Sequence, residues 1–404
     1  MEAGRWHGSC ESAGMHPLPP FSSTPATLTG WLQAQARLRP AGLALRHKQA
    51  GLWQERRWWT LQQEVATLAA GLRARGFQPG HWLQVRCQPR PEALLLSLAA
   101  LWLGGRVRLG HPGAAPLSRR TAASAEAHDA HFVLLDRADD LAGLADLQAG
   151  LHWVGYVERR AAVTLPAGLQ DRVQSSEELL LEGRAAGALD EPIQGEADDT
   201  AFLLQTEQGA LSLSHRDLLE GGLALVDQEG LTHRDEAFAA RAFATEAQLR
   251  YLLAPWLLTG LRLNFPERLA TRDADRREIG PTLVAGTCET YQRVARWVRE
   301  ALPPEGTWQR HLVERALAGR YGRLPRWVVG RRLRDVIGLT RTRAALLIGA
   351  PLPEDDARFF ASLGVAVRVW PEGGAASPRP SREHDSAPPD ERTVQFNLHP
   401  WGAV

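Results

Sequence analysis

Short apolar runs alternate with longer amphipathic segments along most of this chain, and this alternation constrains the fold more than any other feature. Trp82–Cys87 and Ala344–Gly349 have the length and apolar content of buried strands. Pro91–Leu103 and Pro353–Leu363 are longer, begin with proline and are predicted helices. A chain that alternates strands with helices forms parallel sheets covered by helices. The sequence therefore predicts an α/β protein with doubly wound sheets.

The length of the chain indicates more than one lobe, because 404 residues exceed the size of an ordinary domain. We expect a first α/β lobe over residues 26–195 and a second over residues 196–372. The polar connection 183–199 joins them, and a helical insertion is expected at residues 303–340. The N-terminal helix and the hairpin of residues 43–59 are expected to cross onto the second lobe.

The two ends of the chain have a composition that cannot bury a core. Residues 1–25 and 373–404 are rich in Gly, Pro and Ser, and both tails are predicted to be disordered. Elsewhere, 47 basic and 46 acidic side chains are mixed and leave a net charge of +1. A nucleic-acid-binding protein needs a basic stripe, so this partner class is not expected. The most apolar run, Ala93–Leu103, is about half as long as a membrane-spanning helix, so no transmembrane segment is expected.

The three cysteines, Cys10, Cys87 and Cys288, are widely spaced and form no metal-ligand pattern. The thirteen histidines are equally scattered. We therefore expect reduced thiols and no metal-ligating residue. The first 25 residues lack the apolar core of a signal peptide, which predicts a cytoplasmic protein.

Lysine is almost absent, since Lys48 is the only lysine in the chain. Arginine replaces lysine readily on a solvated surface. It does not replace the compact ammonium of a phosphate-loop lysine, a Schiff-base lysine or an attacking amine. The composition therefore argues against mechanisms that depend on a lysine elsewhere in the chain.

Several segments between residues 26 and 370 stand in an informative order and spacing. They read WWTLQQEVATLAAGLRARGFQPGHWLQV, RPEALLLSLAALWLGGRVRL, AHFVLLD, DDTAFLL with ALSLSHRDLL, PTLVAGTCETYQRV and VVGRRLRDVIGLTRTRAALLIGAPLPEDDARFFASLGVAV. Together they resemble the acyl-adenylate-forming superfamily of AMP-dependent synthetases and ligases, and specifically the long-chain acyl-CoA synthetases. The resemblance implies the two doubly wound α/β lobes of that family's large N-terminal domain, with the C-terminal domain absent.

The resemblance also implies a reaction in two steps. In the family, a carboxylate attacks the α-phosphate of ATP to give an acyl-adenylate, and the thiol of CoA then displaces AMP. A Gly-rich loop, a lysine and Mg²⁺ neutralise the triphosphate, and a second lysine contacts carboxylate and phosphate. ATP, Mg²⁺ and CoA are thus implied by the family alone, and no cofactor is expected for this chain.

The chain departs from the family at the phosphate loop. The family carries Thr-Ser-Gly-Thr-Thr-Gly-x-Pro-Lys-Gly, whereas this chain has only residues 205–208 before Gly209. The loop is shorter by about four residues, which removes backbone amides that cradle phosphate. Gly209 stands in the place of the lysine, and Glu207 adds a charge that repels a triphosphate.

Two further motifs are also altered. Phe243–Glu246 replaces the segment in which the family usually has a histidine near the acyl pocket. The adenine-stacking tyrosine, the threonine and the metal-ligating glutamate of the family fall on Pro371, Gly374 and Ala375. Glu372 is a poor substitute ligand, because two glycines follow it. The family's ribose-binding motif and its catalytic lysine are not found after these residues.

A few positions of the nucleotide site are retained. We identify as its remnant Gly209, Ser214, His215, Gly349, Ala350 and Pro351. The alternative for Ser214 and His215 is the cap and first turn of a helix, which we favour. The alternative for the Gly-Ala-Pro sequence is a tight turn between strand and helix. No catalytic residue is assigned.

The losses fall on the phosphate loop, the metal ligand and the lysines, while segments that determine the fold persist. We therefore expect a degenerate AMP-binding protein that does not form acyl-adenylate and binds an acyl or CoA-like molecule or a protein partner. One alternative is an acyl-CoA synthetase completed by a partner chain. Another is the truncated product of a decaying gene. A Ser/His/Asp hydrolase is disfavoured, because no GxSxG elbow occurs.

Overall fold

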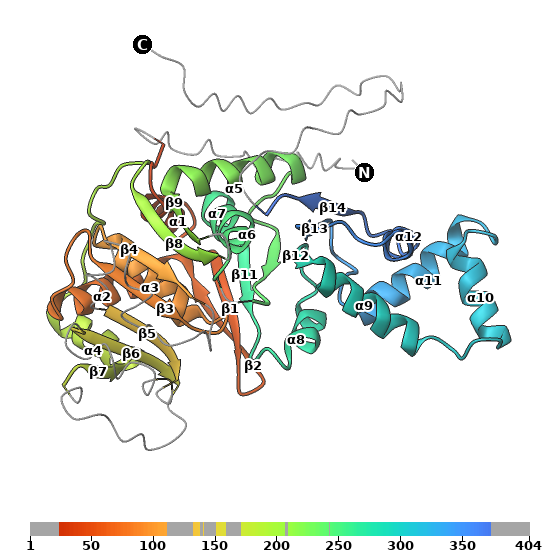
Figure 1. Cartoon of the computed structure of the whole chain (residues 1–404), viewed down its shortest axis with the longest axis horizontal. Helices are drawn as coiled ribbons and strands as arrows, with labels where there is room; N and C mark the ends of the chain where they lie inside the picture. The colour runs from red at the N-terminus through yellow and green to blue at the C-terminus, as the bar shows by residue number, and fades with distance from the viewer. Residues whose placement is uncertain are drawn as a thin grey trace, which may run out of the picture.

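The computed structural model describes residues 24–110, 132–137, 140, 151–158, 171–206, 209–241 and 243–372. Almost all of the tail predicted at 1–25, the whole tail at 373–404 and a helix predicted at 118–128 lie outside these ranges. The described part contains two seven-stranded sheets with helices around them (Figure 1). The prediction of an α/β fold is thus confirmed. No helix in these ranges is long and apolar enough to cross a membrane.

The first sheet has the strand order β7-β6-β5-β3-β4-β8-β9. Its neighbours are parallel except for the hairpin β8–β9. The strands are β3 (Trp82–Arg86), β4 (Arg106–Leu109), β5 (Phe132–Arg137), β6 (Trp153–Glu158), β7 (Val173–Ser175), β8 (Thr200–Thr206) and β9 (Gly209–Ser214). Three helices pack beside this sheet, namely α2 (Trp58–Ala74), α3 (Pro91–Trp102) and α4 (Ser176–Ala186).

The helices α2 and α4 approach each other unusually closely, and two glycines make this possible. A Cβ on Gly183 would lie 2.0 Å from the carbonyl oxygen of Thr67, and one on Gly71 would lie 2.6 Å from that of Leu179. Any larger residue at either position would push the helices apart.

The second sheet has the order β14-β13-β12-β10-β11-β1-β2. Only the hairpin β1–β2 is antiparallel. The strands are β1 (Leu43–Gln49), β2 (Leu52–Arg57), β10 (Glu236–Phe238), β11 (Arg262–Phe265), β12 (Leu283–Thr287), β13 (Ala344–Ile348) and β14 (Val367–Trp370).

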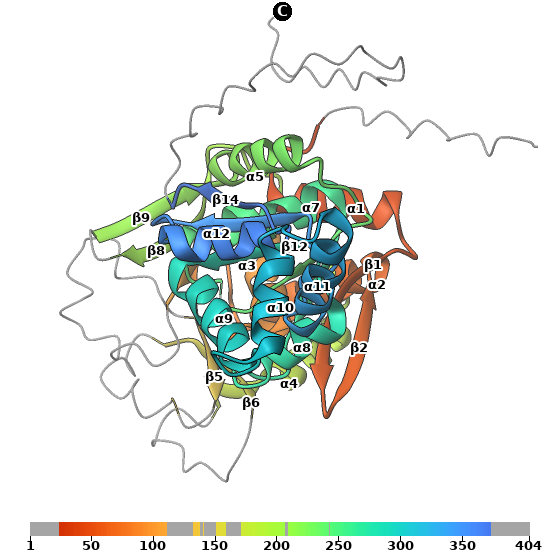
Figure 2. The same cartoon turned by 90° about the vertical axis from the view of Figure 1, so that its right-hand side faces the viewer.

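Ten further helical segments complete the described part. Those that pack among themselves near the first sheet are α1 (Leu28–Leu38), α5 (His215–Glu229), α6 (Glu246–Gln248), the π-helix η3 (Leu249–Leu253) and α7 (Ala254–Thr259). The others are α8 (Arg272–Ile279), α9 (Cys288–Ala301), α10 (Trp308–Leu317), α11 (Arg323–Val336) and α12 (Glu354–Ser362). The helices α10 and α11 lie within the predicted insertion and form the end of the molecule farthest from the first sheet (Figures 1 and 2).

Strands are exchanged between the two halves of the chain. The early hairpin β1–β2 joins the second sheet through the parallel pairing of β1 with β11, so the predicted crossing is confirmed. The later hairpin β8–β9 joins the first sheet, where Val107 of β4 pairs with Phe202 of β8. Residues 200–206 fall within the range expected for the second lobe, yet β8 pairs with β4, because strand order in the chain does not reveal the edge that a strand joins. The proposed division at residues 195 and 196 stays a prediction.

One buried core extends through both sheets and the helices between them. A second core lies under α9 and α12 and includes Tyr291, Ala345 and Phe360. The hydroxyl of Tyr291 donates to the carbonyl of Leu346 at 3.1 Å, and burial raises the pKa of Tyr291 beyond its usual range.

Some predicted boundaries were wrong. The spacing of Thr60 and Gln63 in the sequence predicts a capped helix that begins at Thr60, but this helix begins at Trp58. Its N-cap is Arg57, whose N–H donates to the hydroxyl of Thr60 at 3.1 Å. The chain passes from β2 directly into α2 without a turn, so no separate capping sequence is needed. The strand β9 was not predicted, because residues 209–214 were taken as a loop and a helix cap.

Candidate functional site

Ser214 and His215 hold the start of α5 in place. The hydroxyl of Ser214 accepts from the N–H of Asp217 at 3.1 Å, and the carboxylate of Asp217 accepts from the N–H of Ser214 at 2.9 Å. This reciprocal pair is a capping box. His215 is only 6% exposed, and its Nδ1 accepts from the N–H of Leu28 at 3.3 Å. Ser214 therefore caps α5, and His215 ties the start of α5 to the start of α1.

The burial of His215 makes stability depend on pH. Burial lowers the pKa of His215 to about 4, which the charge of Asp199 offsets only in part. In the unfolded chain the imidazole takes up a proton near pH 6.5, while in the folded protein it stays neutral. The contribution of neutral His215 to the free energy of unfolding is therefore fully present above pH 6.5. It is lost as the pH falls from 6.5 towards 4.

We expect the free energy of unfolding to fall by about 2 kcal/mol between pH 7 and pH 5 because of this one group. The substitution His215→Gln should remove that part of the slope, even if it lowers stability at pH 7. Urea unfolding at several pH values measures this, with exposed His311→Gln as the control. An unchanged slope in His215→Gln would contradict the assignment.

Gly209 lies in an antiparallel ladder. Thr206 of β8 pairs with Gly209 of β9, so only two residues join the strands. The hydroxyl of Thr206 donates to the carbonyl of Gly209 at 2.8 Å. Gly209 has a φ of 123°, which a residue with a side chain rarely adopts. The register leaves no room for the long loop of backbone amides that holds a triphosphate.

Gly349, Ala350 and Pro351 follow β13 at the carboxyl end of the second sheet. The N–H of Gly349 donates to the carbonyl of Trp370 at 3.2 Å, and Gly349 has a φ of 83°. A Cβ on Gly349 would lie 3.4 Å from a carboxylate oxygen of Glu372. The charged group beside this turn is thus a carboxylate. The turn itself belongs to the positions that the resemblance assigns to the nucleotide site.

Trp370 and Pro371 are held against η3. The hydroxyl of Tyr251 donates to the carbonyl of Pro371 at 2.9 Å, and its ring meets that of Trp370 edge to face at 5.3 Å. Pro371 occupies the position of the family's stacking tyrosine, while Gly374 and Ala375 lie outside the described residues. Gly209 and His215 share no hydrogen bond or ion pair with Gly349–Pro351 in the described ranges.

The only lysine is committed elsewhere. The ammonium of Lys48 lies 3.0 Å from a carboxylate oxygen of Asp275 and 2.6 Å from one of Glu278, both on α8. The hydrogen bond to Glu278 and the charge of both acids raise the pKa of Lys48 against the effect of burial. Lys48 therefore fastens the β1–β2 hairpin to α8. Over the described ranges, no group of three or more His, Cys, Asp or Glu side chains could hold a metal ion.

The residues retained from the nucleotide site do not fit ATP and Mg²⁺. Only two residues separate the paired Thr206 and Gly209, the lysine lies in an ion-pair network, and Glu372 places negative charge beside Gly349. A triphosphate needs the opposite arrangement of charge at each of these points.

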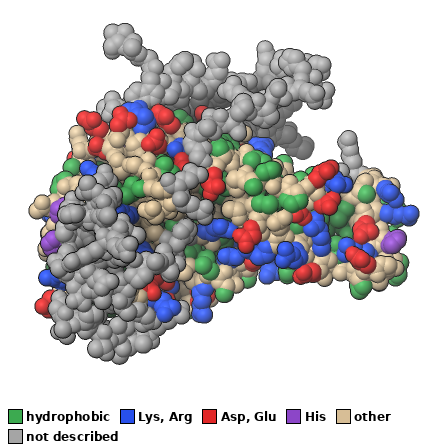
Figure 3. Space-filling model, viewed as in Figure 1, with side chains coloured by type: hydrophobic (Ala, Val, Ile, Leu, Met, Phe, Trp, Pro, Cys, Tyr) green, Lys and Arg blue, Asp and Glu red, His purple; other side chains and the backbone are tan. Residues whose placement is uncertain are grey.

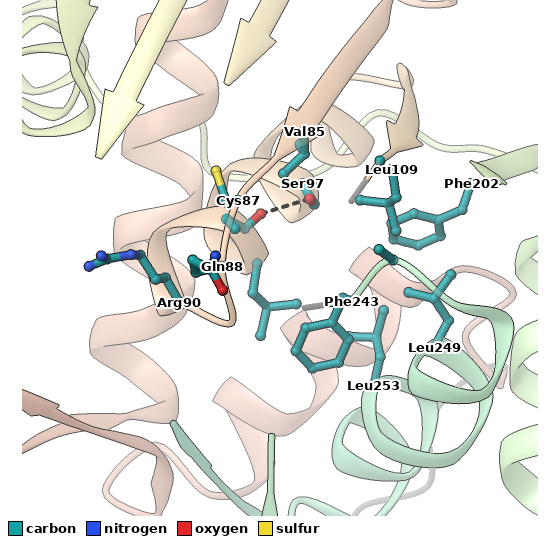
Figure 4. A pocket seen from close by; sticks show the side chains of 14 residues that line it. Val85, Cys87, Gln88, Arg90, Ser97, Leu109, Phe202, Phe243, Leu249 and Leu253 are labelled. Atoms are coloured by element: carbon teal, nitrogen blue, oxygen red, sulfur yellow. Dashed lines mark hydrogen bonds between the residues drawn. The ribbon is translucent and has the colours of Figure 1, made fainter. Parts of the chain in front are cut away.

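A different, small pocket lies where β3, β4 and η3 meet, with a cavity volume of about 20 Å³ (Figure 4). Its walls are mainly apolar and include Leu94, Leu109, Phe202, Phe243 and Leu253. The pocket adjoins the carboxyl ends of β3 and β4, the place where α/β sheets usually bind ligands. Apart from Phe243, no wall residue of this pocket could be predicted from the sequence, because the walls come from distant segments.

One side of this pocket is polar. The Oε1 atom of Gln88 is buried and has no hydrogen-bond partner among the described residues. The guanidinium of Arg90 points away in Figure 4 and pairs with Asp136 and Glu158, at 2.8 Å each. The hydroxyl of Ser97 donates to the carbonyl of Ala93 at 2.7 Å. The amide of Gln88 is therefore the group that is available to a ligand on this side.

Several solved structures share the fold of this chain. The A domain of carboxylic acid reductase from Segniliparus rugosus, in complex with AMP and a co-purified carboxylic acid, is 15% identical with a TM-score of 0.66. This chain covers 60% of that domain, and 85% of this chain is matched. VinN with L-aspartate is 15% identical with a TM-score of 0.60, over 85% of this chain and 74% of that one. A putative long-chain-fatty-acid CoA ligase from Rhodopseudomonas palustris CGA009 is 16% identical with a TM-score of 0.57, over 85% and 74%.

At sequence identities this low, the structural similarity shows that the fold is shared and nothing more. No curated protein matches the chain by sequence. The sequence of residues 32–374, however, matches the family described as AMP-binding enzyme. This match confirms the superfamily that the ordered segments predicted, and the chain belongs to the AMP-binding enzyme family.

Proposed function

We propose that this protein is a family member that does not form acyl-adenylates and that binds an apolar small molecule in the pocket between β3, β4 and η3. The observation that carries the first part is the register of β8 and β9, which pairs Thr206 with Gly209. A hairpin closed this tightly presents no row of free amides to a phosphate chain.

Electrostatics supports the same proposal. Family chemistry brings a nucleotide triphosphate against a carboxylate, so cations must neutralise both groups. Here the ammonium of Lys48 is already paired with Asp275 and Glu278. The carboxylate of Glu372 beside Gly349 opposes the approach of a phosphate.

The pocket supports the second part of the proposal. Its cavity volume of about 20 Å³ has room for little more than one water molecule, so a ligand enters only by displacing wall side chains. Aliphatic and aromatic walls favour an acyl or aromatic group through burial of apolar surface. A hydroxyl or protonated carboxyl at one end of the ligand would donate to the Oε1 atom of Gln88.

The test combines two measurements on the whole chain. In an ATP–pyrophosphate exchange assay with aliphatic and aromatic acids, we expect no exchange above the background without enzyme. In thermal unfolding with the same compounds, we expect at least one to raise the melting temperature, because a ligand that binds only the native state stabilises it.

The variant Ala93→Phe, at a half-buried position on the pocket wall, should fill the space and abolish the thermal shift. Ala301→Phe, at the exposed end of α9, is the matched control and should leave it unchanged. Exchange that depends on the acid and is lost in Gly349→Val would disprove the first part. Equal thermal shifts in all three proteins would disprove the second.

A further inference from the structure

Four arginines line a second small pocket, between β10, β12, α8 and α9, with a cavity volume of about 20 Å³. Arg241 follows β10, Arg272 and Arg276 lie on α8, and Arg293 lies on α9. These positions are up to about 50 residues apart, so no sequence motif indicated the cluster. Lys and Arg side chains gather over α8 and α9 in the space-filling view (Figure 3).

The positive charge in this pocket is poorly balanced. Asp273 is the acidic side chain of the described lining, and its Oδ1 lies 3.3 Å from Arg276 and 3.7 Å from Arg293. Among the described residues, Arg241 donates to two hydroxyls, those of Thr287 at 3.2 Å and Thr290 at 3.0 Å. Exposed Glu289, at the start of α9, adds an attraction to Arg272 that is weaker than the repulsion from Arg293. Four guanidinium groups thus face one lining carboxylate.

Two of these guanidinium groups also have donors without acceptors. Arg276 is 8% exposed, and its Nε is buried with no partner among the residues described. The Nε of Arg272 is also buried and has no hydrogen-bond partner among the described residues. Burial lowers the pKa of Arg276, and burial together with Arg293 lowers that of Arg272. Buried donors on charged groups are normally satisfied, so the pocket lacks an anionic partner.

We propose that this arginine pocket binds a phosphate group, either inorganic phosphate or the phosphate of a small metabolite. Guanidinium forks match the oxygens of phosphate in pairs, and several forks can share one tetrahedral anion. A dianion balances the excess of positive charge more completely than a single carboxylate does. The hydroxyl of Thr290 lies on the same wall as a further donor.

The position of the pocket has a consequence for the ligand. The segment at 281–294, one of those that carry the resemblance to the family, contributes Val284, Ala285, Thr290 and Arg293 to it. The guanidinium groups at this wall favour an anionic ligand over an apolar one. No wall residue is shared with the apolar pocket, so this inference goes beyond the proposed function and does not depend on it.

The test is isothermal titration and thermal unfolding with inorganic phosphate, at constant ionic strength set with chloride. We expect saturable binding of phosphate by the native chain and at least tenfold weaker binding by Arg276→Met. Arg315→Met, at an exposed position on α10, should bind phosphate as the native chain does. A second arm with glucose 6-phosphate and AMP identifies the source, since tighter binding of either than of phosphate indicates a metabolite.

Two further variants keep the proposal falsifiable if Arg276→Met folds poorly. Asp273→Asn removes the competing carboxylate and should tighten phosphate binding several-fold, an effect opposite to that of general damage. Ala93→Phe blocks the other pocket and should leave phosphate binding unchanged. Phosphate binding that is equal in the native chain, Arg276→Met and Asp273→Asn would show an adventitious ion only and overturn the proposal.

Discussion

Replacing Trp256 with alanine is expected to lower the free energy of unfolding by about 3–5 kcal/mol, the range for removal of a large buried aromatic side chain. Trp256 of α7 is fully buried and stacks on Trp58 of α2, with ring centroids 4.9 Å apart. Its Nε1 donates to the carbonyl of Ala44 in β1 at 2.9 Å. The substitution would leave a cavity and an unpaired carbonyl where three elements meet.

Urea unfolding followed by far-ultraviolet circular dichroism measures this effect without relying on tryptophan fluorescence. Trp308→Ala on α10 is the matched control, because that side chain is 68% exposed and should change stability by less than about 0.5 kcal/mol. Trp256→Phe should give an intermediate loss, since it keeps a ring against Trp58 but not the hydrogen bond. Similar losses for Trp256→Ala and Trp308→Ala would contradict the packing described.

Replacing Asp235 with alanine is expected to cost about 3 kcal/mol, because it leaves a buried ion-pair network without its acceptor. The side chain of Asp235 is 4% exposed. It accepts from Nε of Arg343 at 2.7 Å, from the hydroxyl of Thr282 at 2.8 Å and from the N–H of Thr232 at 2.8 Å. The carboxylate thereby joins the amino ends of β10, β12 and β13.

The same carboxylate gives a second, independent measurement. Burial raises the pKa of Asp235, but the hydrogen bonds from Arg343, Thr232 and Thr282 outweigh it and hold the pKa below its usual value. Its contribution to stability is thus present above about pH 4 and is lost as the pH falls through the folded-state pKa. Asp235→Asn should be less stable at pH 7 and lose less stability below pH 4. If the free energy of unfolding fell as steeply below pH 4 in Asp235→Asn as in the native chain, this account would be contradicted.

The sequence predicted those elements whose signal is local. The helix expected at Pro91–Leu103 is found at Pro91–Trp102, and the strand expected at Ala344–Gly349 is found at Ala344–Ile348. Both segments have a high apolar content and are bounded by proline or glycine, so their sequences are compatible with few other conformations. The strand β9 has weak alternation and is defined by its ladder to β8, so it could not be seen without the partner.

The candidate sites could be predicted even less well, because most of their residues are far apart in the sequence. Ser214 was predictable as a cap because Asp217 lies three residues away, within the same turn. The arginine pocket depends on Arg241 and Arg293, which are brought together only by the pairing of β10 with β12. The role of Lys48 depends on α8, more than 200 residues later in the chain. Chemistry that arises from such distant neighbours is invisible to spacing and periodicity.

The exchange of hairpins between the sheets governs how the protein can be made and divided. During synthesis, β1 must wait for β11, about 200 residues later, which takes roughly 10–40 s at ordinary rates of translation. Until then the β1–β2 hairpin has only its own marginal ladder. A cut anywhere between β2 and β8 leaves each sheet short of strands carried by the other piece. Two fragments made in this way could complete their cores only by reassociating, so this protein is naturally suited to fragment complementation and not to separate expression of its halves.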